Sequence, residues 1–397
     1  MKVLQVLDKQ ARDGGVAVHV EALSRGLRDR GVAVETLRLH PRDAPAPSPR
    51  EGDRHRLPFT YGVRQGMLAA AGLDAILDEV RPDIVHLHGA FTRFSHVLLE
   101  RLQARGPLVA TLHDTRPFCY AMTRLYRPTG QPCQRVCGAG CFATGCLRPD
   151  GLVDSVRWLR RWRVDSQALR AWAALPRLIA PSQFIADLAA RHGFRRDRLE
   201  VVPHATPPVD AAAWPRDDPP LIVFAGRMVE DKGPLVLLRA LAALEPRPWR
   251  AVLIGGGPLA AEVDTRIDRL GLRSRVEAVG QQAPAAVEAM LARARLVVMP
   301  SLVAESFGLS GLEALAAATP VIAFAHGGVL EWLRDGRNGL AIEPFDAAGL
   351  STAIARLLDD EALARRLGEA GREDVRRGHD PARTLDRMLA IYEALTS

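Results

Sequence analysis

The sequence predicts two α/β domains, each built on a doubly wound sheet of parallel strands. The chain has 397 residues, more than one hydrophobic core usually serves, so two domains are expected. Short runs rich in valine, isoleucine and leucine alternate with longer helical stretches along the chain. Most of these runs do not alternate apolar with polar residues, which is typical of parallel strands covered on both faces. This strand–helix–strand order favours a Rossmann-like architecture in both halves.

The predicted strands fall into two groups of six. In the first half they span 2–7, 32–39, 83–88, 107–112, 177–180 and 199–202. In the second half they span 221–225, 250–254, 275–279, 296–299, 320–324 and 339–342. Helical segments lie between most of them, as parallel strands require a crossover connection.

The segment 205–220 predicts the domain boundary, because prolines cluster at both of its ends and proline interrupts helices and sheet ladders. We expect a first domain at 1–208 and a second at 209–375. We further expect a C-terminal helix at 376–397 that packs back on the first domain. A second proline-rich segment, 41–58, is predicted to be a surface loop.

The composition, with 48% hydrophobic and 25% charged residues, is typical of an ordinary soluble protein. The first residues read as a buried strand, without the apolar stretch and cleavage site of a signal peptide. No window approaches the apolar length of a membrane-spanning helix. We therefore expect a cytoplasmic protein.

The formal net charge of +7 is unevenly distributed along the chain. Basic residues exceed acidic ones in 1–208, whereas acidic residues are in excess in 209–397. A basic first half favours an anionic ligand or an anionic membrane face on that side. Nucleic acid is disfavoured, because no basic run with interleaved aromatic residues resembles a recognition module.

Two cations follow the first strand of the second half. Arg227 and Lys232 lie between the strand end at Gly226 and a helix expected after Gly233. Ligands of open α/β sheets bind outside the carboxyl ends of strands. A planar guanidinium and a mobile ammonium suit a diphosphate, although two solvated surface cations are the plain alternative.

A second candidate turn follows the strand at 296–299. A helix rich in small residues is predicted to begin near Phe307, with Ser306 as its cap. The first amides of a helix lack partners within the helix and carry partial positive charge. Gly308 lets the backbone approach a ligand closely, so this turn predicts a phosphate site.

Glu305 and Glu313 flank this turn and lie too far apart along a helix to act on one atom. They can hold opposite ends of one extended ligand, Glu305 a sugar hydroxyl and Glu313 a ribose diol. The alternative is a capping carboxylate and a solvated helical glutamate.

These motifs together resemble the retaining family 4 glycosyltransferases of GT-B fold. The resemblance rests on the Glu305–Glu313 spacing around Ser-Phe-Gly-Leu, on Gly-Arg at 226–227 with Lys-Gly at 232–233, and on the segments 327–331 and 335–339. It runs along nearly the whole chain. It implies two Rossmann-like domains facing across a cleft, and transfer of a sugar from a nucleoside diphosphate to an acceptor with retention.

The resemblance also assigns roles to the second-domain residues. Arg227 and Lys232 would bind the diphosphate and stabilise the leaving nucleotide, and Glu305 would bind the donor sugar. Glu313 would accept hydrogen bonds from the ribose. The donor-binding backbone would come from Ser306, Phe307, Gly308 and Leu309, and Gln281, beside Gly280, would meet the nucleobase. No divalent metal is required, because cations and amides offset the diphosphate charge.

In the first domain, a glycine pair at 14–15 follows the first strand and precedes a helix. The resemblance implies that Gly15 contacts the donor, and that His113, which follows a strand, contacts the donor sugar or orients the nucleophile. His88 ends a neighbouring strand and is a further candidate. A lone histidine is more often structural. The acceptor is unknown, and an anionic or lipid-linked one fits the basic half.

Two other readings of the same site remain. A nucleotide-sugar epimerase of similar fold would use the same ligand but needs more acid and base groups. A catalytically idle nucleotide-sugar-binding protein would not need the complete set of Arg227, Lys232, Glu305 and Glu313.

All five cysteines fall within one predicted insertion of the first domain, 119–146. They are Cys119, Cys133, Cys137, Cys141 and Cys146. Clustered cysteines in a cytoplasmic protein favour metal over disulfides, and four thiolates could hold a structural zinc. An iron–sulfur cluster, disulfides and unligated thiols are the alternatives. Some family 4 members carry a similar cluster.

The stretch 154–172 predicts a helix with Trp158, Trp162 and Trp172 on one stripe and arginines mostly away from it. Its tryptophans are expected to pack on the first core. The alternative is an interfacial helix at the inner face of the cell membrane, in peripheral contact with anionic lipid.

Overall fold

The computed structural model describes most of the chain. The described residues are 1–7, 15–41, 53–59, 63–89, 96–119, 124–126, 128–129, 131–147, 151–207, 209 and 217–397. They divide into two compact units, and unit 1 comprises Met1–Pro203 with Ala382–Ser397. Unit 2 comprises His204–Pro381. Half of the expected linker at 205–220, namely 208 and 210–216, and the glycine loop before Gly15 lie outside the described residues.

Unit 1 contains a seven-stranded parallel sheet in the order β3-β2-β1-β4-β5-β8-β9 within the described residues. Its strands are β1 (Lys2–Leu7), β2 (Ala33–Pro41), β3 (Asp53–Phe59), β4 (Ile84–His88), β5 (Leu108–Thr111), β8 (Arg177–Ala180) and β9 (Leu199–Val201). Its helices are α1 (Gly15–Asp29), α2 (Val63–Val80), α3 (His96–Ala104), α4 (Gly140–Ala143), α5 (Gly151–Ala173), α6 (Gln183–Arg191) and α13 (Pro381–Thr396). A short antiparallel pair, β6 (Leu125–Tyr126) and β7 (Gln131–Pro132), lies within the cysteine segment.

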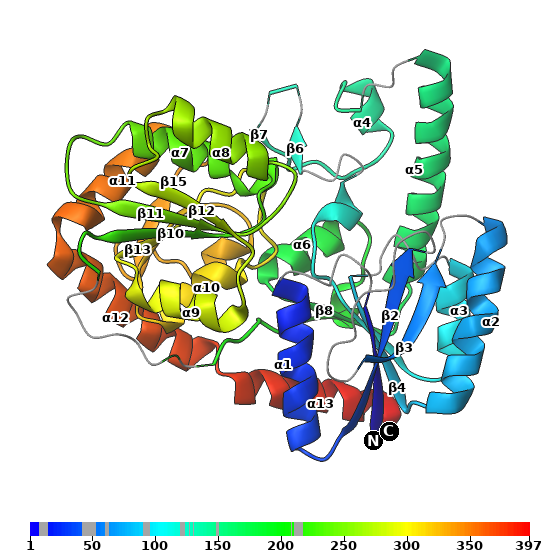
Figure 1. The fold of residues 1–397 in the computed structure, drawn as a ribbon. Helices are drawn as coiled ribbons and strands as arrows, with labels where there is room; N and C mark the ends of the chain where they lie inside the picture. Colours follow the sequence, from blue (N-terminus) through cyan, green and yellow to red (C-terminus); the bar gives the residue numbers. More distant parts are fainter. Residues whose placement is uncertain are drawn as a thin grey trace. The chain divides into compact units, whose positions relative to one another are not determined.

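Unit 2 contains a six-stranded parallel sheet in the order β12-β11-β10-β13-β14-β15. Its strands are β10 (Leu221–Ala225), β11 (Arg250–Ile254), β12 (Val276–Gly280), β13 (Leu296–Met299), β14 (Val321–Phe324) and β15 (Gly339–Ile342). Its helices are α7 (Pro234–Ala242), α8 (Ala260–Arg269), α9 (Pro284–Arg293), α10 (Leu309–Ala316), α11 (Ala347–Asp359) and α12 (Glu361–Gly378). Figure 1 shows helices flanking this sheet.

The predicted doubly wound fold is confirmed by how the strands distribute their side chains. On β10, Ile222 and Phe224 join a core shared with α7, α8 and α11. Leu221 and Val223 point the other way, into a core shared with α9 and α10. Successive side chains of a strand face opposite sides of the sheet, so a strand covered on both sides must be apolar at every position.

Unit 1 is built in the same way. Leu4 and Val6 of β1 join the core that includes α5 and α6. Val3, on the other face, joins a core with α1 and with Met388 and Tyr392 of α13. The C-terminal helix therefore completes one face of the first sheet. The chain ends close to where it begins, as the two labelled termini show (Figure 1).

The interpretation of 41–58 as a surface loop was wrong in part. Residues 53–59 form β3, an edge strand paired in parallel with β2. The sequence of β3 is polar and contains Pro58, which makes it unlike the buried apolar runs. Edge strands tolerate proline and polar residues because one side of the ladder stays unpaired.

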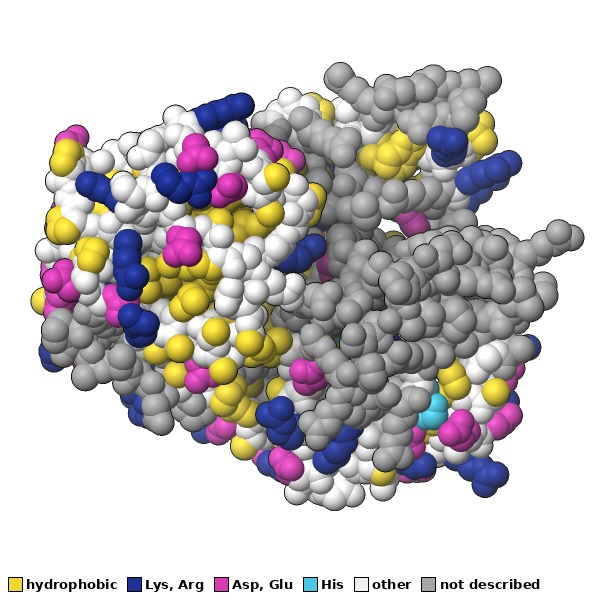
Figure 2. All heavy atoms as spheres, viewed as in Figure 1, with side chains coloured by type: hydrophobic (Ala, Val, Ile, Leu, Met, Phe, Trp, Pro, Cys, Tyr) yellow, Lys and Arg dark blue, Asp and Glu magenta, His cyan; other side chains and the backbone are white. Residues whose placement is uncertain are grey.

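On the face drawn in Figure 2, acidic and basic side chains lie interspersed over unit 2. The ion pairs of unit 2 include Arg273 with Asp264 and Asp268, and Arg247 with Asp359. None of the helices within the described residues combines the length and apolar character that a bilayer crossing demands.

Candidate functional site

Two loops of unit 2 lie beside one another at the carboxyl ends of the central strands. Strands β10 and β13 are parallel neighbours, so the turn after β10 and the loop after β13 leave the sheet on the same edge. The backbone amide of Leu302 donates to the carbonyl of Asp231 at 2.8 Å, which joins the two loops directly. This edge of a parallel sheet is where ligands of such folds bind.

Lys232 and Glu305 form the central contact between these loops. The Lys232 ammonium lies 2.5 Å from Glu305 Oε1, and the Ser301 hydroxyl donates to the same oxygen. The Glu305 side chain is only 10% exposed, whereas that of Lys232 is 27% exposed. Burial alone would raise the pKa of Glu305, but Lys232, Ser301 and His326 together hold it below its usual value. Glu305 is therefore an ionised carboxylate whose place is fixed by a cation.

Arg227 belongs to the same turn and is exposed. Its charge acts on Asp231: burial raises the pKa of that carboxyl, and Arg227 and Lys232 oppose the rise. The exposed guanidinium and the less exposed ammonium thus lie on one turn, and their binding of one anion stays a prediction.

A glycine turn after β11 braces the Arg227 turn. The Met228 amide donates to the carbonyl of Gly256, and the Leu259 amide donates to the carbonyl of Met228. Gly255 has a φ of 133°, and a Cβ added there would lie 1.9 Å from the carbonyl oxygen of Gly226. Only glycine permits this approach, so the segment shapes the candidate site and is not merely a turn.

The helix after the second loop begins later than expected. Helix α10 spans Leu309–Ala316, and its N-cap is Gly308 with φ of 88°, without a side-chain capping bond. The expectation that Ser306 caps a helix starting near Phe307 was wrong, because the left-handed conformation at Gly308 sets the helix start instead. The amides of Gly311 and Leu312 donate to the Gly308 carbonyl, so only Leu309 and Ser310 precede the first bonds of the helix, and the phosphate site stays a prediction.

Phe307 lies with its ring inside unit 2, where it is 1% exposed. It packs against the rings of His204 and His379, with centroids 5.2 and 5.6 Å away. Only its backbone is thus available to a ligand. Trp332 holds that backbone, because the indole Nε1 donates to the Phe307 carbonyl at 2.7 Å.

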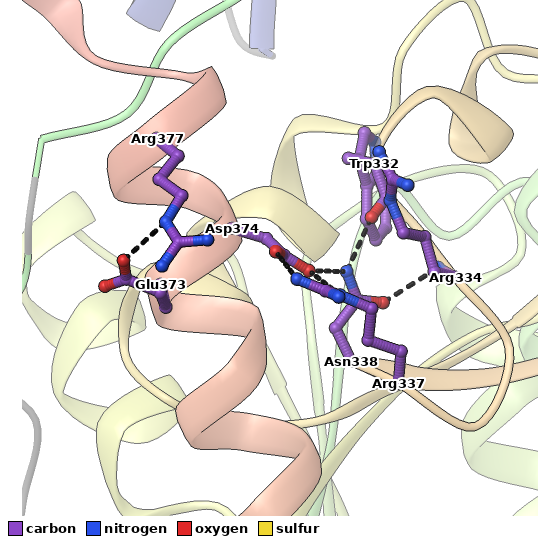
Figure 3. A network of polar contacts seen from close by, with 7 residues as sticks. All are labelled: Trp332, Arg334, Arg337, Asn338, Glu373, Asp374 and Arg377. Atoms are coloured by element: carbon purple, nitrogen blue, oxygen red, sulfur yellow. Dashed lines mark hydrogen bonds and ion pairs between the residues drawn. The ribbon is translucent and has the colours of Figure 1, made fainter.

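A polar network anchors Trp332 in turn (Figure 3). Asn338 is fully buried. Its side-chain amide donates to the Trp332 carbonyl at 2.7 Å and to the Asp374 carboxylate. Its side-chain oxygen accepts a hydrogen bond from the backbone amide of Arg334. Asp374, on α12, also receives both guanidinium bonds of Arg337. The turn before α10 is thereby fixed to α12 through three successive contacts: Phe307 with Trp332, Trp332 with Asn338, and Asn338 with Asp374. Sequence reasoning did not find this network, because its members are ordinary polar residues.

Glu313 and Gln281 take separate positions in unit 2. Glu313 is partly buried on α10, and burial, together with Glu288, raises its pKa to about 7. Gln281 is exposed directly after β12. Gln281 thus follows the carboxyl end of a strand, whereas Glu313 lies in the middle of α10, near Glu288 of α9.

The predicted residues of unit 1 are Gly15 and His113. Gly15 is the exposed first residue of α1. His113 is buried, two residues beyond the end of β5, and its Nε2 lies 2.9 Å from Nδ1 of His88. His88 ends β4 and is fully buried. The His19 ring packs edge-on to that of His113 at 5.4 Å.

The cysteines form part of a small apolar cluster in unit 1. Cys119, Cys137 and Cys141 pack with Leu147 and Phe142, and the Sγ atoms of Cys137 and Cys141 lie 3.8 Å apart. All five cysteines are free of disulfides. Among the described residues, no three histidine, cysteine or acidic side chains are placed to hold one metal ion.

The tryptophans of α5 divide between two places. Trp172 is 1% exposed in the main core of unit 1. Trp158 and Trp162 instead pack against the cysteine cluster. The expectation that all three pack on the first core therefore holds for Trp172 alone.

Comparison with known proteins places this geometry in a family. Residues 13–208 match the family described as Glycosyltransferase Family 4, and residues 210–374 match Glycosyl transferases group 1. The chain is 30% identical to a D-inositol 3-phosphate glycosyltransferase of Xylanimonas cellulosilytica, over 96% of this chain and 92% of that protein.

Solved structures agree on the fold. Sucrose-phosphate synthase from Thermosynechococcus elongatus superposes with a TM-score of 0.74 at 22% identity, over 100% of this chain and 99% of the other. Anabaena HepE in complex with UDP-glucose gives a TM-score of 0.72 at 20% identity, with both chains fully covered. With its two doubly wound sheets and these relatives, the chain belongs to the family 4 glycosyltransferases of GT-B fold, enzymes that move a sugar from a nucleotide-sugar donor to an acceptor with retention of configuration.

Proposed function

We propose that the two joined loops of unit 2 bind the donor, with Lys232, Arg227 and the first amides of α10 on its diphosphate. The observation that carries this is the Lys232–Glu305 pair, because it places a cation and a fixed carboxylate on adjoining loops. The cations would stabilise charge on the departing nucleotide, and Glu305 would accept hydrogen bonds from the sugar hydroxyls. The Ser306–Leu309 backbone would contact the phosphate or the sugar.

The nucleoside would lie beyond the diphosphate. Glu313 would accept from the ribose hydroxyls, and Gln281 would meet the base. From unit 1, Gly15 and His113 would contact the donor. Retention without a covalent nucleophile favours front-face displacement, in which the nucleotide phosphate helps to take the acceptor proton.

Release of nucleoside diphosphate from a panel of UDP-, GDP- and ADP-sugars tests the site. Thermal shift first selects the donor, and turnover is then compared between the wild type, Lys232→Ala and Glu305→Ala. We expect both variants to lose activity by orders of magnitude. Near-native turnover in both would overturn the assignment, and formation of a sugar isomer would indicate epimerisation instead.

We infer that transfer needs no divalent cation, because Arg227, Lys232 and the α10 amides offset the diphosphate charge. Turnover in excess EDTA should equal that in magnesium. A large loss that magnesium restores would show that the cations on the protein do not suffice.

An anionic acceptor fits the charge of the first domain. Basic residues are in excess there, and the Xylanimonas relative is named for an inositol phosphate acceptor. We propose a phosphorylated or lipid-linked acceptor bound by unit 1. Phosphorylated polyols should accept sugar, their dephosphorylated counterparts should not, and rising salt should increase KM for the acceptor.

Helix α5 is the proposed contact with an anionic membrane face, which would place the enzyme at the inner side of the cytoplasmic membrane. Val156 and Leu159 are 43% and 44% exposed beside the exposed Arg157, Arg160 and Arg163. Flotation with phosphatidylglycerol vesicles should recover the protein, and neutral vesicles should not. The variant Leu159→Glu should remain unbound.

A structural zinc on the cysteine segment is a further proposal, with an iron–sulfur cluster as the alternative. The softness of thiolate ligands fits either, and the 3.8 Å separation of Cys137 and Cys141 Sγ suits two ligands of one zinc ion. The Arg124 amide donates to Cys119 Sγ at 3.4 Å, which fixes the position of that sulfur. Elemental analysis and a visible spectrum of the purified protein test the proposal, and Cys137→Ala should lose the metal.

A further inference from the structure

A row of buried polar side chains crosses the sheet of unit 1 and ends at His113. Gln5 is on β1 and His88 on β4, and these strands are parallel neighbours. His88 Nε2 lies 2.5 Å from Gln5 Oε1, and His88 Nδ1 lies 2.9 Å from His113 Nε2. Gln5 and His88 are fully buried and His113 is 6% exposed.

The chemistry of the first contact sets the direction of the whole row. A carbonyl oxygen can only accept, so His88 must carry its proton on Nε2. A neutral His88 then presents a lone pair at Nδ1. The hydrogen in the second contact must therefore come from Nε2 of His113, which leaves the lone pair of a neutral His113 on Nδ1.

The surroundings keep the His113 ring neutral. Burial, with the nearby His19 and His86, lowers the pKa of His113 well below its usual value. Burial also lowers the pKa of His19 to about 4 and, together with His19, that of His86 to about 3. No carboxylate among the described residues lies in the row to favour an imidazolium.

A second row runs beside the first. The Tyr392 hydroxyl lies 2.7 Å from His86 Nδ1, and His86 Nε2 lies 2.7 Å from the Thr111 hydroxyl. Burial raises the pKa of Tyr392, so its hydroxyl stays protonated.

We propose that Gln5 and His88 are positioning residues that hold His113 in one tautomer, with its proton on Nε2 and its lone pair on Nδ1. The functional consequence rests on the proposed role of His113 at the donor sugar. Any group that meets His113 through Nδ1 must donate the hydrogen bond, as a sugar hydroxyl can and an ionised carboxylate cannot. The row thus makes His113 Nδ1 a hydrogen-bond acceptor, which excludes groups that have no hydrogen to donate.

Long-range ¹H–¹⁵N correlation spectra of the full chain, labelled at histidine and free of nucleotide, test the tautomer directly. The His113→Asn spectrum identifies the His113 signals among those of the eleven histidines. We expect a protonated Nε2 and an unprotonated Nδ1. An unprotonated Nε2 in the wild type would overturn the proposal.

Gln5→Glu should reverse the tautomer. The new carboxylate accepts from His88 Nε2 and favours the imidazolium, which then donates from Nδ1 to His113 Nε2 and moves the His113 proton to Nδ1. Should this variant fold poorly, Gln5→Met removes the amide and should give His113 signals of mixed tautomers. The matched control is Tyr392→Phe, which deletes a hydroxyl from the second row and should leave the His113 signals unchanged.

Activity separates this inference from the proposed function. In Gln5→Met, kcat should fall at least tenfold while the KM for the donor and the melting temperature change little. If the wild-type protein turns over the donor but its His113 ring is protonated on Nδ1, the proposed tautomer is refuted and the proposed function is unaffected. If the His113 ring shows the expected tautomer but the protein does not turn over the donor, the Gln5–His88–His113 row is supported and the role of His113 at the donor sugar is refuted.

Discussion

Lys232 helps to keep Glu305 ionised. Glu305 is nearly buried, so its ionised form depends on the ammonium 2.5 Å away. Such an ion pair adds little to the free energy of unfolding while both partners are present. Removing one partner lowers the free energy of unfolding substantially, because the other is left buried and charged. The same pair is the proposed donor grip, so stability and activity should respond together.

Lys232→Met keeps the apolar stem and removes the charge. We expect donor turnover to fall ~10²-fold or more and the free energy of unfolding at pH 7 to fall by about 1–3 kcal/mol. The folded-state pKa of Glu305 lies below its unfolded value, so its contribution is present at neutral pH and is lost as pH falls through the folded pKa. The stability difference should therefore shrink in acid. Lys232→Arg, which keeps the charge, is the control.

Glu313 should impose the opposite pH dependence on stability. Its pKa in the folded protein is raised to about 7. Between its unfolded-state pKa and pH 7, the folded protein therefore binds more protons than the unfolded chain. The free energy of unfolding falls as pH rises through this range. Glu313→Gln should be more stable than the wild type at pH 8, by about 1–3 kcal/mol, and similar to it at pH 5. Equal melting curves at both pH values would contradict this environment for Glu313.

The same titration should appear in ligand binding. On the proposed role, the ionised Glu313 accepts from ribose hydroxyls, so affinity for a UDP-sugar should rise as pH increases through 7. A UDP-sugar is the appropriate probe because its phosphodiester charges do not titrate in this range. Calorimetry should show the rise in the wild type and a flat profile in Glu313→Gln.

At the scale of elements, the turns of unit 2 depend on close backbone approaches. Gly255 and its neighbour Gly256 offer a matched pair. A Cβ at 255 would collide with the Gly226 carbonyl, whereas one at 256 would meet no atom within 4 Å. Gly255→Ala should therefore lower both the melting temperature and the affinity for the donor, and Gly256→Ala should change neither. Equal behaviour of the two would contradict this packing.

The network in Figure 3 offers a second comparison. Asn338→Ala would leave the buried Trp332 carbonyl and Arg334 amide without their bonds, and should cost about 2–4 kcal/mol of folding free energy. Arg337→Ala removes an exposed ion pair with Asp374 and should leave the free energy of unfolding nearly unchanged. Urea titration measures both. Comparable losses would mean that Asn338 does not anchor Trp332.

Elements differed in how far the sequence could predict them. Every strand of the second sheet was predicted within a residue at each end, because each is an apolar run covered on both faces. Strand β3 was not, because an edge strand needs no such run. The start of α10 was misplaced, since a serine cap is a visible signal and a left-handed Gly308 is not. The Gln5–His88–His113 row depends on sheet register, which local sequence does not encode.

At the scale of the whole molecule, helix α13 packs on unit 1, so residues from both ends of the chain share one hydrophobic core. Ile391 is 4% exposed in the core that also holds Val3 and Ile84. Ile391→Ala should destabilise unit 1 by about 2–5 kcal/mol. Hydrogen exchange should show faster exchange in β1 and β4 and unchanged protection in β10 and β13. Ile354→Ala, in the core of unit 2, should give the reverse pattern.

The late position of α13 also bears on the order in which the protein folds during synthesis. Every residue of unit 2 precedes Ala382 in the chain, so the core of that unit does not depend on the rest of α13. One face of the first sheet does depend on it, because Met388, Ile391 and Tyr392 are synthesised only after unit 2. The sheet whose strands are translated first therefore keeps apolar surface uncovered until the whole of unit 2 has been synthesised.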